Sequence, residues 1–246
     1  MDKQCFLITE NDCIARGTWR MTLLGDASAF TRPGQFAEIA LPGRFLRRPI
    51  SVCRLTDRGF TIIYRVVGAG TQQLSNLLPG TTLDVLTGLG NGYDVSKAGP
   101  APLLVGGGCG CPPLLELAAH LLAAGRRVHA VLGFNTADEI FLADELAALG
   151  ALVTVTTMDG SAGQKGLVTD AMAQLSFSDF FACGPLPMMR AVCAATDRPG
   201  QVSLEARMGC GFGACVGCTI ETARGPRRVC KDGPVFDRAD VLWDKL

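Results

Sequence analysis

The stretch Pro102-Leu-Leu-Val-Gly-Gly-Gly-Cys-Gly-Cys-Pro-Pro113 marks the point at which the pattern of the chain changes. An apolar strand over 102–105 runs into three glycines, and a helix begins where proline can occupy the first turn. A glycine-rich turn between strand and helix suits a nucleotide phosphate, because unpaired backbone N–H groups gather at a helix N-terminus. The Gly-x-Gly-x-x-Gly fingerprint is incomplete, since Cys111 replaces the third glycine when the motif is read from Gly106.

From this stretch onward, apolar strands alternate with helical segments. Further strands are expected over 128–133, 152–157, 179–183 and 201–204, and helices over 138–149, 167–175 and 186–195. This alternation predicts a Rossmann-like parallel sheet with helices on both faces. Ligands bind such sheets beyond the carboxyl ends of the strands. The residues expected to contact the nucleotide are Gly106, Gly107, Gly108, Cys183, Gly184 and Pro185.

The segment after the second of these strands indicates which nucleotide binds. It runs from Phe134 to Glu139 and contains no arginine that would bind a ribose 2′-phosphate. Asp138 and Glu139 would repel such a phosphate. The sequence therefore favours NAD over NADP.

Upstream of Pro100 the chain has the pattern of short strands. Segments 35–40, 60–67 and 83–86 are apolar or rich in β-branched and aromatic residues, and Pro-Gly turns precede the first and the last. No long helical pattern interrupts them. The region predicts an antiparallel β-barrel or sandwich.

Two short motifs in this first region are compatible with a flavin. Arg47-Arg48-Pro49-Ile50-Ser51 combines a cation for a diphosphate, a turn fixed by proline and a hydroxyl for the edge of a flavin ring. Downstream, Gly68-Ala69-Gly70-Thr71 permits close approach of the backbone to a phosphate. Alone, the first would also fit a basic surface turn and the second an ordinary hairpin end, but their order and separation favour a flavin.

The strongest chemical signal is the cysteine series near the C-terminus. Cys210, Cys215, Cys218 and Cys230 have the Cys-x4-Cys-x2-Cys…Cys spacing of plant-type [2Fe–2S] sites. Glycines between them allow the backbone to wrap closely, so that N–H groups can point at the sulfurs. A structural zinc site normally needs two Cys-x2–4-Cys pairs, and only one is present. Buried free thiols are the weaker alternative.

Composition and charge restrict the remaining possibilities. Lys and Arg total 23 and Asp and Glu total 23, so the chain lacks the basic character of a nucleic-acid-binding protein. We expect no signal peptide and no membrane span, since the most apolar segment contains several glycines, Pro112, Pro113 and Glu116. The eleven cysteines are then expected to be reduced in the cytoplasm. Cys5, Cys13, Cys53 and Cys193 are expected to be small buried apolar residues, and Cys109 and Cys111 to pack in the core or the cofactor loop.

The flavin, nucleotide and cysteine motifs, in this order, resemble those of the ferredoxin reductase family. Leu204-Glu-Ala-Arg-Met-Gly-Cys-Gly211, the following Gly-Ala-Cys-Val-Gly-Cys loop and Arg228-Val-Cys-Lys-Asp-Gly-Pro-Val-Phe236 narrow the resemblance to electron-transfer subunits of type B dihydroorotate dehydrogenases. The resemblance covers essentially the whole chain. It implies an oxidoreductase subunit that takes electrons from dihydroorotate oxidation to NAD+ in pyrimidine (UMP) biosynthesis.

The resemblance also implies cofactors and a partner. Electrons would leave FMN in a separate catalytic subunit, cross the [2Fe–2S] cluster, and pass through FAD to NAD+. Two chains of each kind would form a heterotetramer, and no acid or base for proton removal from dihydroorotate would reside in this chain. The residues implied in FAD binding are Arg48, Pro49, Ile50, Ser51, Ile63, Tyr64, Arg65, Gly70 and Thr71.

Two positions depart from the family pattern. Ile50 stands where many reductases carry a tyrosine that stacks on the flavin, and Cys109 and Cys111 stand where aliphatic residues are expected. Two alternatives also remain: a related reductase subunit of a hydrogenase, sulfite reductase or ferredoxin:NADP complex, and a zinc-stabilised binding module without redox function. The expected division is an FAD-binding barrel over 1–98, a nucleotide-binding α/β domain over 99–200 and a cluster-binding segment over 201–246.

Overall fold

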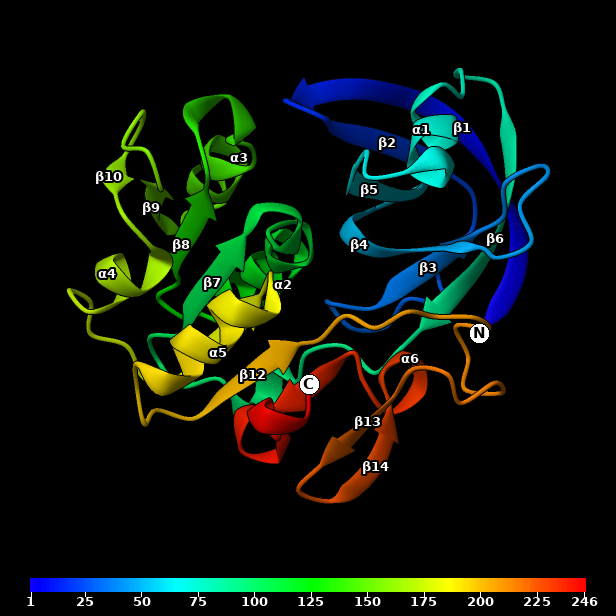
Figure 1. Cartoon of the computed structure of the whole chain (residues 1–246). Helices are drawn as coiled ribbons and strands as arrows, with labels where there is room; N and C mark the ends of the chain where they lie inside the picture. Colours follow the sequence, from blue (N-terminus) through cyan, green and yellow to red (C-terminus); the bar gives the residue numbers. More distant parts are fainter.

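A closed six-stranded barrel forms the first half of the computed structural model, which describes all residues from 1 to 246. The strands pair in the order β1-β2-β5-β4-β3-β6 and every pair is antiparallel. A closed barrel has no free strand edge. The barrel is seen on the right of Figure 1, with the short helix α1 (Ala69–Ser75) across one end. Its strands are β1 (Asp2–Ala15), β2 (Thr18–Leu24), β3 (Phe36–Ile39), β4 (Arg48–Thr56), β5 (Gly59–Arg65) and β6 (Thr82–Leu89).

Aromatic side chains fill the barrel interior. Phe60 lies between Phe6 and Phe30, with edge-to-face centroid distances of 5.0 and 5.1 Å. All three side chains are buried. Such packing of large rings contributes beyond the apolar area that they bury. The predicted antiparallel barrel is confirmed.

A seven-stranded sheet forms the second half of the molecule. The strand order is β10-β9-β8-β7-β11-β12-β15, and all neighbours are parallel except the last pair. This arrangement confirms the predicted parallel sheet. The strands are β7 (Leu103–Gly107), β8 (His129–Phe134), β9 (Leu152–Thr157), β10 (Gln164–Lys165), β11 (Phe180–Cys183), β12 (Gly200–Ser203) and β15 (Val235–Asp237).

Helices cover both faces of this sheet, as expected. Leu117 and Leu146 belong to one buried cluster, which joins α2 (Pro112–Ala123) and α3 (Ala143–Ala148) to one face. Met172 and Met189 belong to another, which joins α4 (Val168–Met172) and α5 (Leu186–Ala194) to the opposite face. The sheet and these helices occupy the left side of Figure 1.

The predicted helix over 138–149 is wrong in its first half. Residues Ala137–Glu139 form a 3-10 turn, η3, and α3 begins only at Ala143. Phe141 packs edge-to-face on Phe134 at 5.4 Å, and Leu142 has a φ of 66°. The packing of these two apolar residues interrupts the helix, since a positive φ is incompatible with helical continuation.

The prediction that Cys5 and Cys13 are buried is also wrong. Both are exposed, whereas Cys53 and Cys193 are buried as expected. In β1 the side chains of Phe6 and Ile8 point into the barrel, and alternation along a strand therefore turns Cys5 outward.

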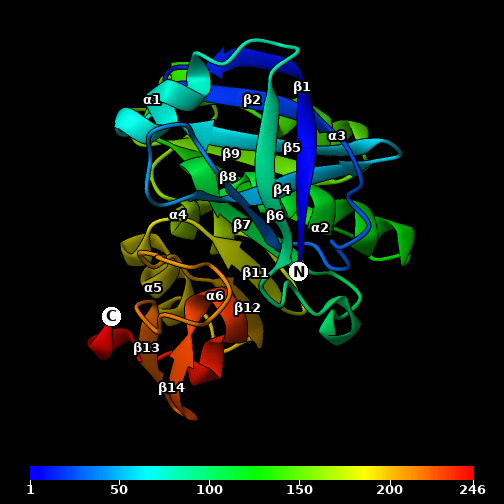
Figure 2. The same ribbon diagram turned by 90° about the vertical axis from the view of Figure 1, so that its right-hand side faces the viewer.

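The last forty residues leave the seven-stranded sheet and rejoin it through β15. They form the hairpin β13 (Thr219–Thr222) and β14 (Gly225–Arg228), then α6 (Val229–Asp232), and then β15, which pairs with β12. Four further 3-10 turns are η1 (Val95–Lys97), η2 (Gly108–Gly110), η4 (Arg238–Asp240) and η5 (Trp243–Lys245). Figure 2 shows the hairpin at the base of the molecule, below the barrel. The strand β15 was not expected from the sequence, and it binds the C-terminal segment into the second domain.

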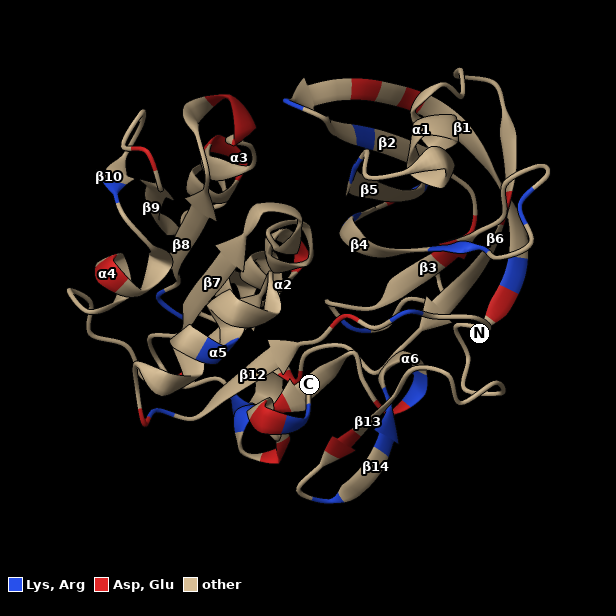
Figure 3. Ribbon diagram, viewed as in Figure 1, with Lys and Arg blue, Asp and Glu red and all other residues tan.

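No helix of this chain is long and apolar enough to cross a membrane. Basic and acidic residues are interspersed over most elements in Figure 3, in keeping with the zero net charge.

Candidate functional site

The four predicted cluster cysteines lie in and beside an irregular loop that leads from β12 to β13. Cys210 and Cys215 lie on its outer side, where Cys210 is half-buried and Cys215 is exposed. Cys218 closes the loop before β13, and Cys230 lies in α6; both are buried. The structure therefore brings together thiols from two separate segments of chain, as the predicted ligand set requires.

The thiols form two pairs that are held by backbone N–H groups. The Sγ of Cys210 accepts hydrogen bonds from the N–H groups of Ala214 at 3.2 Å and Cys215 at 3.4 Å. The N–H of Cys230 donates to the Sγ of Cys218 at 3.4 Å. Burial alone would raise the pKa of Cys210, but N–H groups of Cys215 and Phe212 and the Cys215 side chain outweigh it and lower the pKa to about 6. Such donors stabilise a thiolate, the form that binds metal.

This donor set fits a two-iron cluster. Each iron of a [2Fe–2S] cluster takes two thiolates, so two neighbouring pairs suit it. Cys210 also raises the pKa of Cys230, after the larger effects of burial and of the Cys218 side chain, which indicates that the two pairs lie close together. No three His, Cys, Asp or Glu side chains of the chain converge as ligands of a single ion. The arrangement does not favour a four-cysteine zinc site, which requires all ligands around one centre.

The barrel reaches the cluster loop through Glu38. A Cβ atom on Gly211, the residue after Cys210, would lie 2.4 Å from Oε1 of Glu38, so only glycine permits this approach. Gly211 has a φ of 76°, which also favours glycine. Burial raises the pKa of Glu38 to about 7, against the lowering effect of Arg47.

The two predicted flavin motifs meet in space. Arg48 begins β4 and Gly70 lies in the first turn of α1, and a Cβ on Gly70 would lie 2.1 Å from Nε of Arg48. The guanidinium group thus covers Gly70. The hydroxyl of Thr71 accepts hydrogen bonds from the N–H groups of Val67 at 2.9 Å and Gly68 at 3.2 Å, which fixes the start of α1.

The other residues of the expected flavin set differ in how accessible their side chains are to a ligand. Pro49, Ile50 and Ser51 are half-buried along β4. Ile63 and Tyr64 are buried, and the Tyr64 hydroxyl donates to Oδ1 of Asn11 at 2.8 Å in the barrel. The ring of Tyr64 therefore belongs to the barrel core, and only its backbone remains available to a ligand.

A pocket of about 580 Å³ lies at the carboxyl ends of β7, β8, β9 and β11, where the sequence places the nucleotide. Gly107, Gly108, Gly184 and Pro185 of the expected nucleotide set line it. Gly106 and Cys183 do not: a Cβ on Gly106 would meet the Sγ of Cys111 at 2.8 Å, and Cys183 is buried.

Two thiols in the glycine-rich turn have different surroundings. Cys109 lines the pocket and Cys111 is fully buried beneath it. Burial raises the pKa of Cys109 to about 11 and that of Cys111 well above its ordinary value. Both are therefore protonated thiols, in agreement with the expected packing role.

Asp138 and Glu139, the two acids after β8, are not free to repel a ribose 2′-phosphate, contrary to expectation. Glu139 is 5% exposed, and its carboxylate binds Arg16 at 2.9 Å and Arg65 at 2.8 Å. Asp138 also pairs with Arg16, at 3.3 Å. Because arginines from the barrel neutralise these acids, their repulsion of a 2′-phosphate is not a sound reason for preferring NAD.

Glu205 is a pocket residue to which the sequence analysis assigned no role. It follows β12 and lines the pocket near Cys109 and Cys183, whose pKa values its charge raises to a lesser extent than burial does. Burial raises the pKa of Glu205 itself. Its position in the Leu204–Gly211 motif was the available signal, but the motif alone does not show which way the side chain points.

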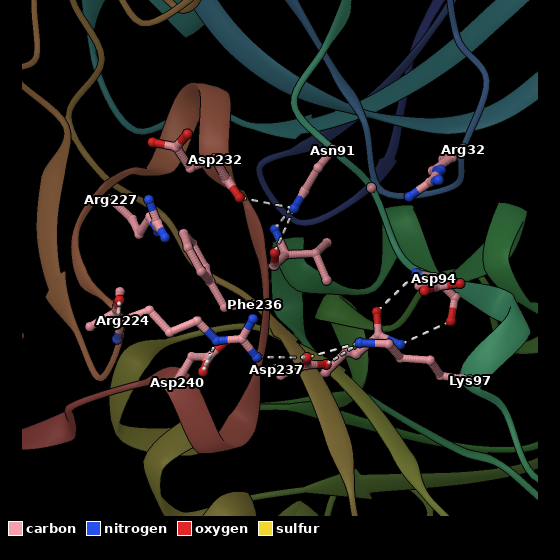
Figure 4. A pocket seen from close by; sticks show the side chains of 14 residues that line it. Arg32, Asn91, Asp94, Lys97, Arg224, Arg227, Asp232, Phe236, Asp237 and Asp240 are labelled. Carbon is pink, nitrogen blue, oxygen red and sulfur yellow. Dashed lines mark hydrogen bonds and ion pairs between the residues drawn. The ribbon is translucent and has the colours of Figure 1, made fainter.

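A second cavity of about 260 Å³ lies between the barrel exit, the sheet and the hairpin β13–β14 (Figure 4). Two ion pairs lie in it: Arg224 with Asp240 at 2.8 Å, and Lys97 with Asp237 at 2.9 Å. Asn91 donates to the carbonyls of Asp232 and Val235 at its edge. Polar contacts at this cavity therefore connect the segment after the barrel to the C-terminal segment.

Two family models match parts of this chain. Residues 104–194 match the family described as "Oxidoreductase NAD-binding domain", and residues 205–242 match "Iron-sulfur cluster binding domain of dihydroorotate dehydrogenase B". A relative from Fusobacterium nucleatum subsp. nucleatum is 44% identical over 95% of this chain and 96% of its own length. A relative from Bacillus mycoides is 40% identical over 98% of this chain and 99% of its own. Both are named "Dihydroorotate dehydrogenase B (NAD(+)), electron transfer subunit".

Solved structures show the same architecture. A chain from the structure titled "Insights into flavin-based electron bifurcation via the NADH-dependent reduced ferredoxin-NADP oxidoreductase structure" has a TM-score of 0.90 and 34% identity, covering 97% of this chain and 90% of its own. The FAD/NAD-binding domain of a nitric oxide dioxygenase from Vibrio cholerae has a TM-score of 0.66 at 23% identity, covering 79% and 92%, and shares the fold.

Proposed function

This chain belongs to the family of electron transfer subunits of dihydroorotate dehydrogenase B, and on that basis we propose that it carries electrons from dihydroorotate oxidation to NAD+ in pyrimidine biosynthesis. Oxidation of dihydroorotate to orotate releases two electrons and two protons. NAD+ takes both electrons and one proton as a hydride, and the other proton goes to solvent. A [2Fe–2S] cluster held by the cysteine loop would supply one-electron transfer, and the flavin and nucleotide sites would pass the electrons to NAD+.

The observation that carries this proposal is the contact between the cysteine loop and the barrel. Glu38 of β3 touches Gly211 beside Cys210, and β3 pairs with β4, the strand that bears Arg48. The proposed iron–sulfur and flavin sites therefore lie beside the same pair of strands, β3 and β4. Short separation favours direct electron transfer, and the protein contributes chiefly by holding the sites in place.

Each site has its own residues in this proposal. Cys210 and Cys215 would hold one iron and Cys218 and Cys230 the other. Arg48 would bind the FAD diphosphate beside Gly70. FAD, when bound, supplies the conversion between single-electron transfer and hydride transfer. The remaining proposed flavin contacts are Pro49, Ile50, Ser51, Ile63, Tyr64, Arg65 and Thr71. The proposed nucleotide contacts are Gly107, Gly108, Gly184 and Pro185, which line the pocket, whereas Gly106 and Cys183 do not line it and are left out.

The name of the relatives implies a partner, since an electron transfer subunit serves a separate catalytic subunit. We propose an FMN-containing catalytic subunit as the electron donor and a heterotetramer of two chains of each kind. The proposed functional units are 1–98 for FAD, 99–200 for NAD and 201–246 for the cluster. Co-purification followed by light scattering tests the assembly: a mass equal to one chain of each kind contradicts the tetramer.

Replacement of Cys215 by alanine tests the electron route. Dihydroorotate-to-NAD+ transfer by the reconstituted complex should fall at least 100-fold, because one iron loses a ligand. NADH oxidation by an artificial acceptor, which needs only flavin and nucleotide, should be retained. Cys5→Ala is the matched control, since Cys5 is an exposed thiol on β1 outside the ligand set. Unchanged turnover in Cys215→Ala contradicts the route.

A second candidate function is supported by similarity to a solved structure. The 34% identity to a chain from the NADH-dependent reduced ferredoxin-NADP oxidoreductase structure favours a subunit of a related reductase. Dihydroorotate-dependent NADH formation by the co-purified complex supports the first function. NADPH-dependent ferredoxin reduction in its place supports the second.

A further inference from the structure

Glu38 is a buried carboxylate without a hydrogen-bond partner. Its side chain is 1% exposed, and neither Oε1 nor Oε2 has a donor. The residue lies in β3 between Pro49 of β4 and Leu86 of β6. Burial of an unpartnered acid lowers stability, so a group of this kind in a folded protein calls for an explanation.

The cations nearest in sequence bind other groups. Arg47 donates to Oδ1 of Asp84 at 2.9 Å and to the carbonyls of Asp84 and Glu38. Arg48 donates to the carbonyl of Leu46 at 2.7 Å and lies on Gly70. Neither forms an ion pair with Glu38, although both lie near enough to favour its ionised form.

The side chain of Glu38 is directed at the cysteine loop. Its Oε1 lies against the α-carbon of Gly211, and Cys210 is close enough for its thiolate to disfavour the ionised carboxylate. Interaction between charges is reciprocal, so a carboxylate at Glu38 equally disfavours negative charge at Cys210. When ionised, Glu38 is therefore a negative group between the cysteine loop and the strand of Arg48.

We propose that the Glu38 carboxylate lowers the reduction potential of the [2Fe–2S] cluster that Cys210, Cys215, Cys218 and Cys230 would bind. This inference rests on the proposed function. The cluster gains one electron on reduction, and a buried negative charge beside one ligand disfavours that gain more strongly than it would in water. Charge and hydrogen bonding around the sulfurs are general determinants of cluster potential. A lower potential favours onward transfer of the electron to the flavin site.

A potentiometric titration followed by electron paramagnetic resonance tests this proposal. The whole chain is reconstituted anaerobically with iron and sulfide and titrated at pH 8.5, above the value of about 7 to which burial raises the pKa of Glu38. Glu38→Gln should shift the cluster midpoint to a more positive potential, because it removes the charge and keeps the shape. Glu116→Gln is the matched control, since Glu116 is a buried carboxylate in α2 that binds Arg54. Its cluster midpoint should not change.

A second variant and two outcomes make the test decisive. Glu38→Met also removes the charge and should shift the midpoint in the same direction, even if Glu38→Gln folds poorly. An unchanged midpoint in a variant that retains its cluster overturns the inference, as does an equal shift in Glu116→Gln. If the unsubstituted chain binds no [2Fe–2S] cluster, the proposed function itself fails, and this result is distinct from an unchanged potential.

Discussion

At the scale of single residues, Arg48 and Gly70 show how a binding site is assembled from distant positions. The guanidinium group of Arg48 occupies the space that a side chain at residue 70 would need. A larger residue at position 70 would therefore require the Arg48 side chain to move. The pair places a fixed cation beside the first turn of α1, where a diphosphate would also meet backbone N–H groups.

Replacement of Arg48 by alanine should weaken FAD binding about 10- to 100-fold, since a hydrogen bond to a charged group contributes about 1.5–3 kcal/mol. Fluorescence titration of the flavin-free chain with FAD measures the change. Arg58→Ala is the control, because Arg58 is exposed in the turn between β4 and β5. Equal FAD affinity in the Arg48 variant and the unsubstituted chain would refute a phosphate role for this residue.

At the scale of elements, Glu139 of η3 joins the sheet domain to the barrel. Its carboxylate binds Arg16 from the β1–β2 turn and Arg65 at the end of β5. It also accepts hydrogen bonds from Asn135. Burial tends to raise the pKa of Glu139, but Arg16, Asn135 and Arg65 together lower it to about 2.

The stability supplied by Glu139 should depend on pH in a defined direction. A carboxylate whose pKa is lowered by folding stabilises the folded state fully above its unfolded pKa, about 4.3, and this contribution disappears as pH falls towards 2. Glu139→Gln should therefore reduce the free energy of unfolding by about 2–3 kcal/mol at pH 7.

Urea denaturation at several pH values measures this effect, and the difference from the unsubstituted chain should narrow below pH 4. Glu221→Gln, in which an exposed residue of β13 is changed, should have no effect. A difference for Glu139→Gln that is constant between pH 7 and pH 3 would contradict the ionic origin of this stabilisation.

At the scale of the whole molecule, the C-terminal segment is held by both domains. Strand β15 extends the sheet, and Asn91, just beyond the last barrel strand, binds the segment next to α6 (Figure 4). Its side chain donates to the carbonyl of Asp232 at 3.0 Å and of Val235 at 2.9 Å, and accepts from the N–H of Val235 at 3.2 Å. These bonds fix the position of Cys230 relative to the barrel.

Asn91→Ala should loosen the C-terminal segment, because three hydrogen bonds disappear and their buried partners remain unsatisfied, at a cost of about 1–3 kcal/mol. Hydrogen exchange followed by mass spectrometry should show faster exchange in residues 219–237 and little change in the barrel. Asn76→Ala, in which an exposed residue is changed, is the control. Unaltered exchange in 219–237 would show that β15 alone holds the segment.

Much of this architecture was predictable because its signals are local. The change of period at Pro102 distinguishes barrel from sheet, and the spacing from Cys210 to Cys218 indicates a cluster loop whatever surrounds it. Wrong predictions arose where local pattern competes with tertiary packing. Cys5 was expected inside but points outward, because the register of β1 is set by Phe6 and Ile8.

The sequence by itself determined the fold class and the family, and it predicted the cysteine set. Each depends on short-range order: strand and helix periodicity, glycine turns, or ligands within a few residues of one another. Only the tertiary structure decided that Arg48 covers Gly70, that barrel arginines neutralise Glu139 and that Glu38 faces Gly211. These contacts join residues far apart in the chain. Their formation depends on barrel closure and on how the domains pack, which no local pattern specifies.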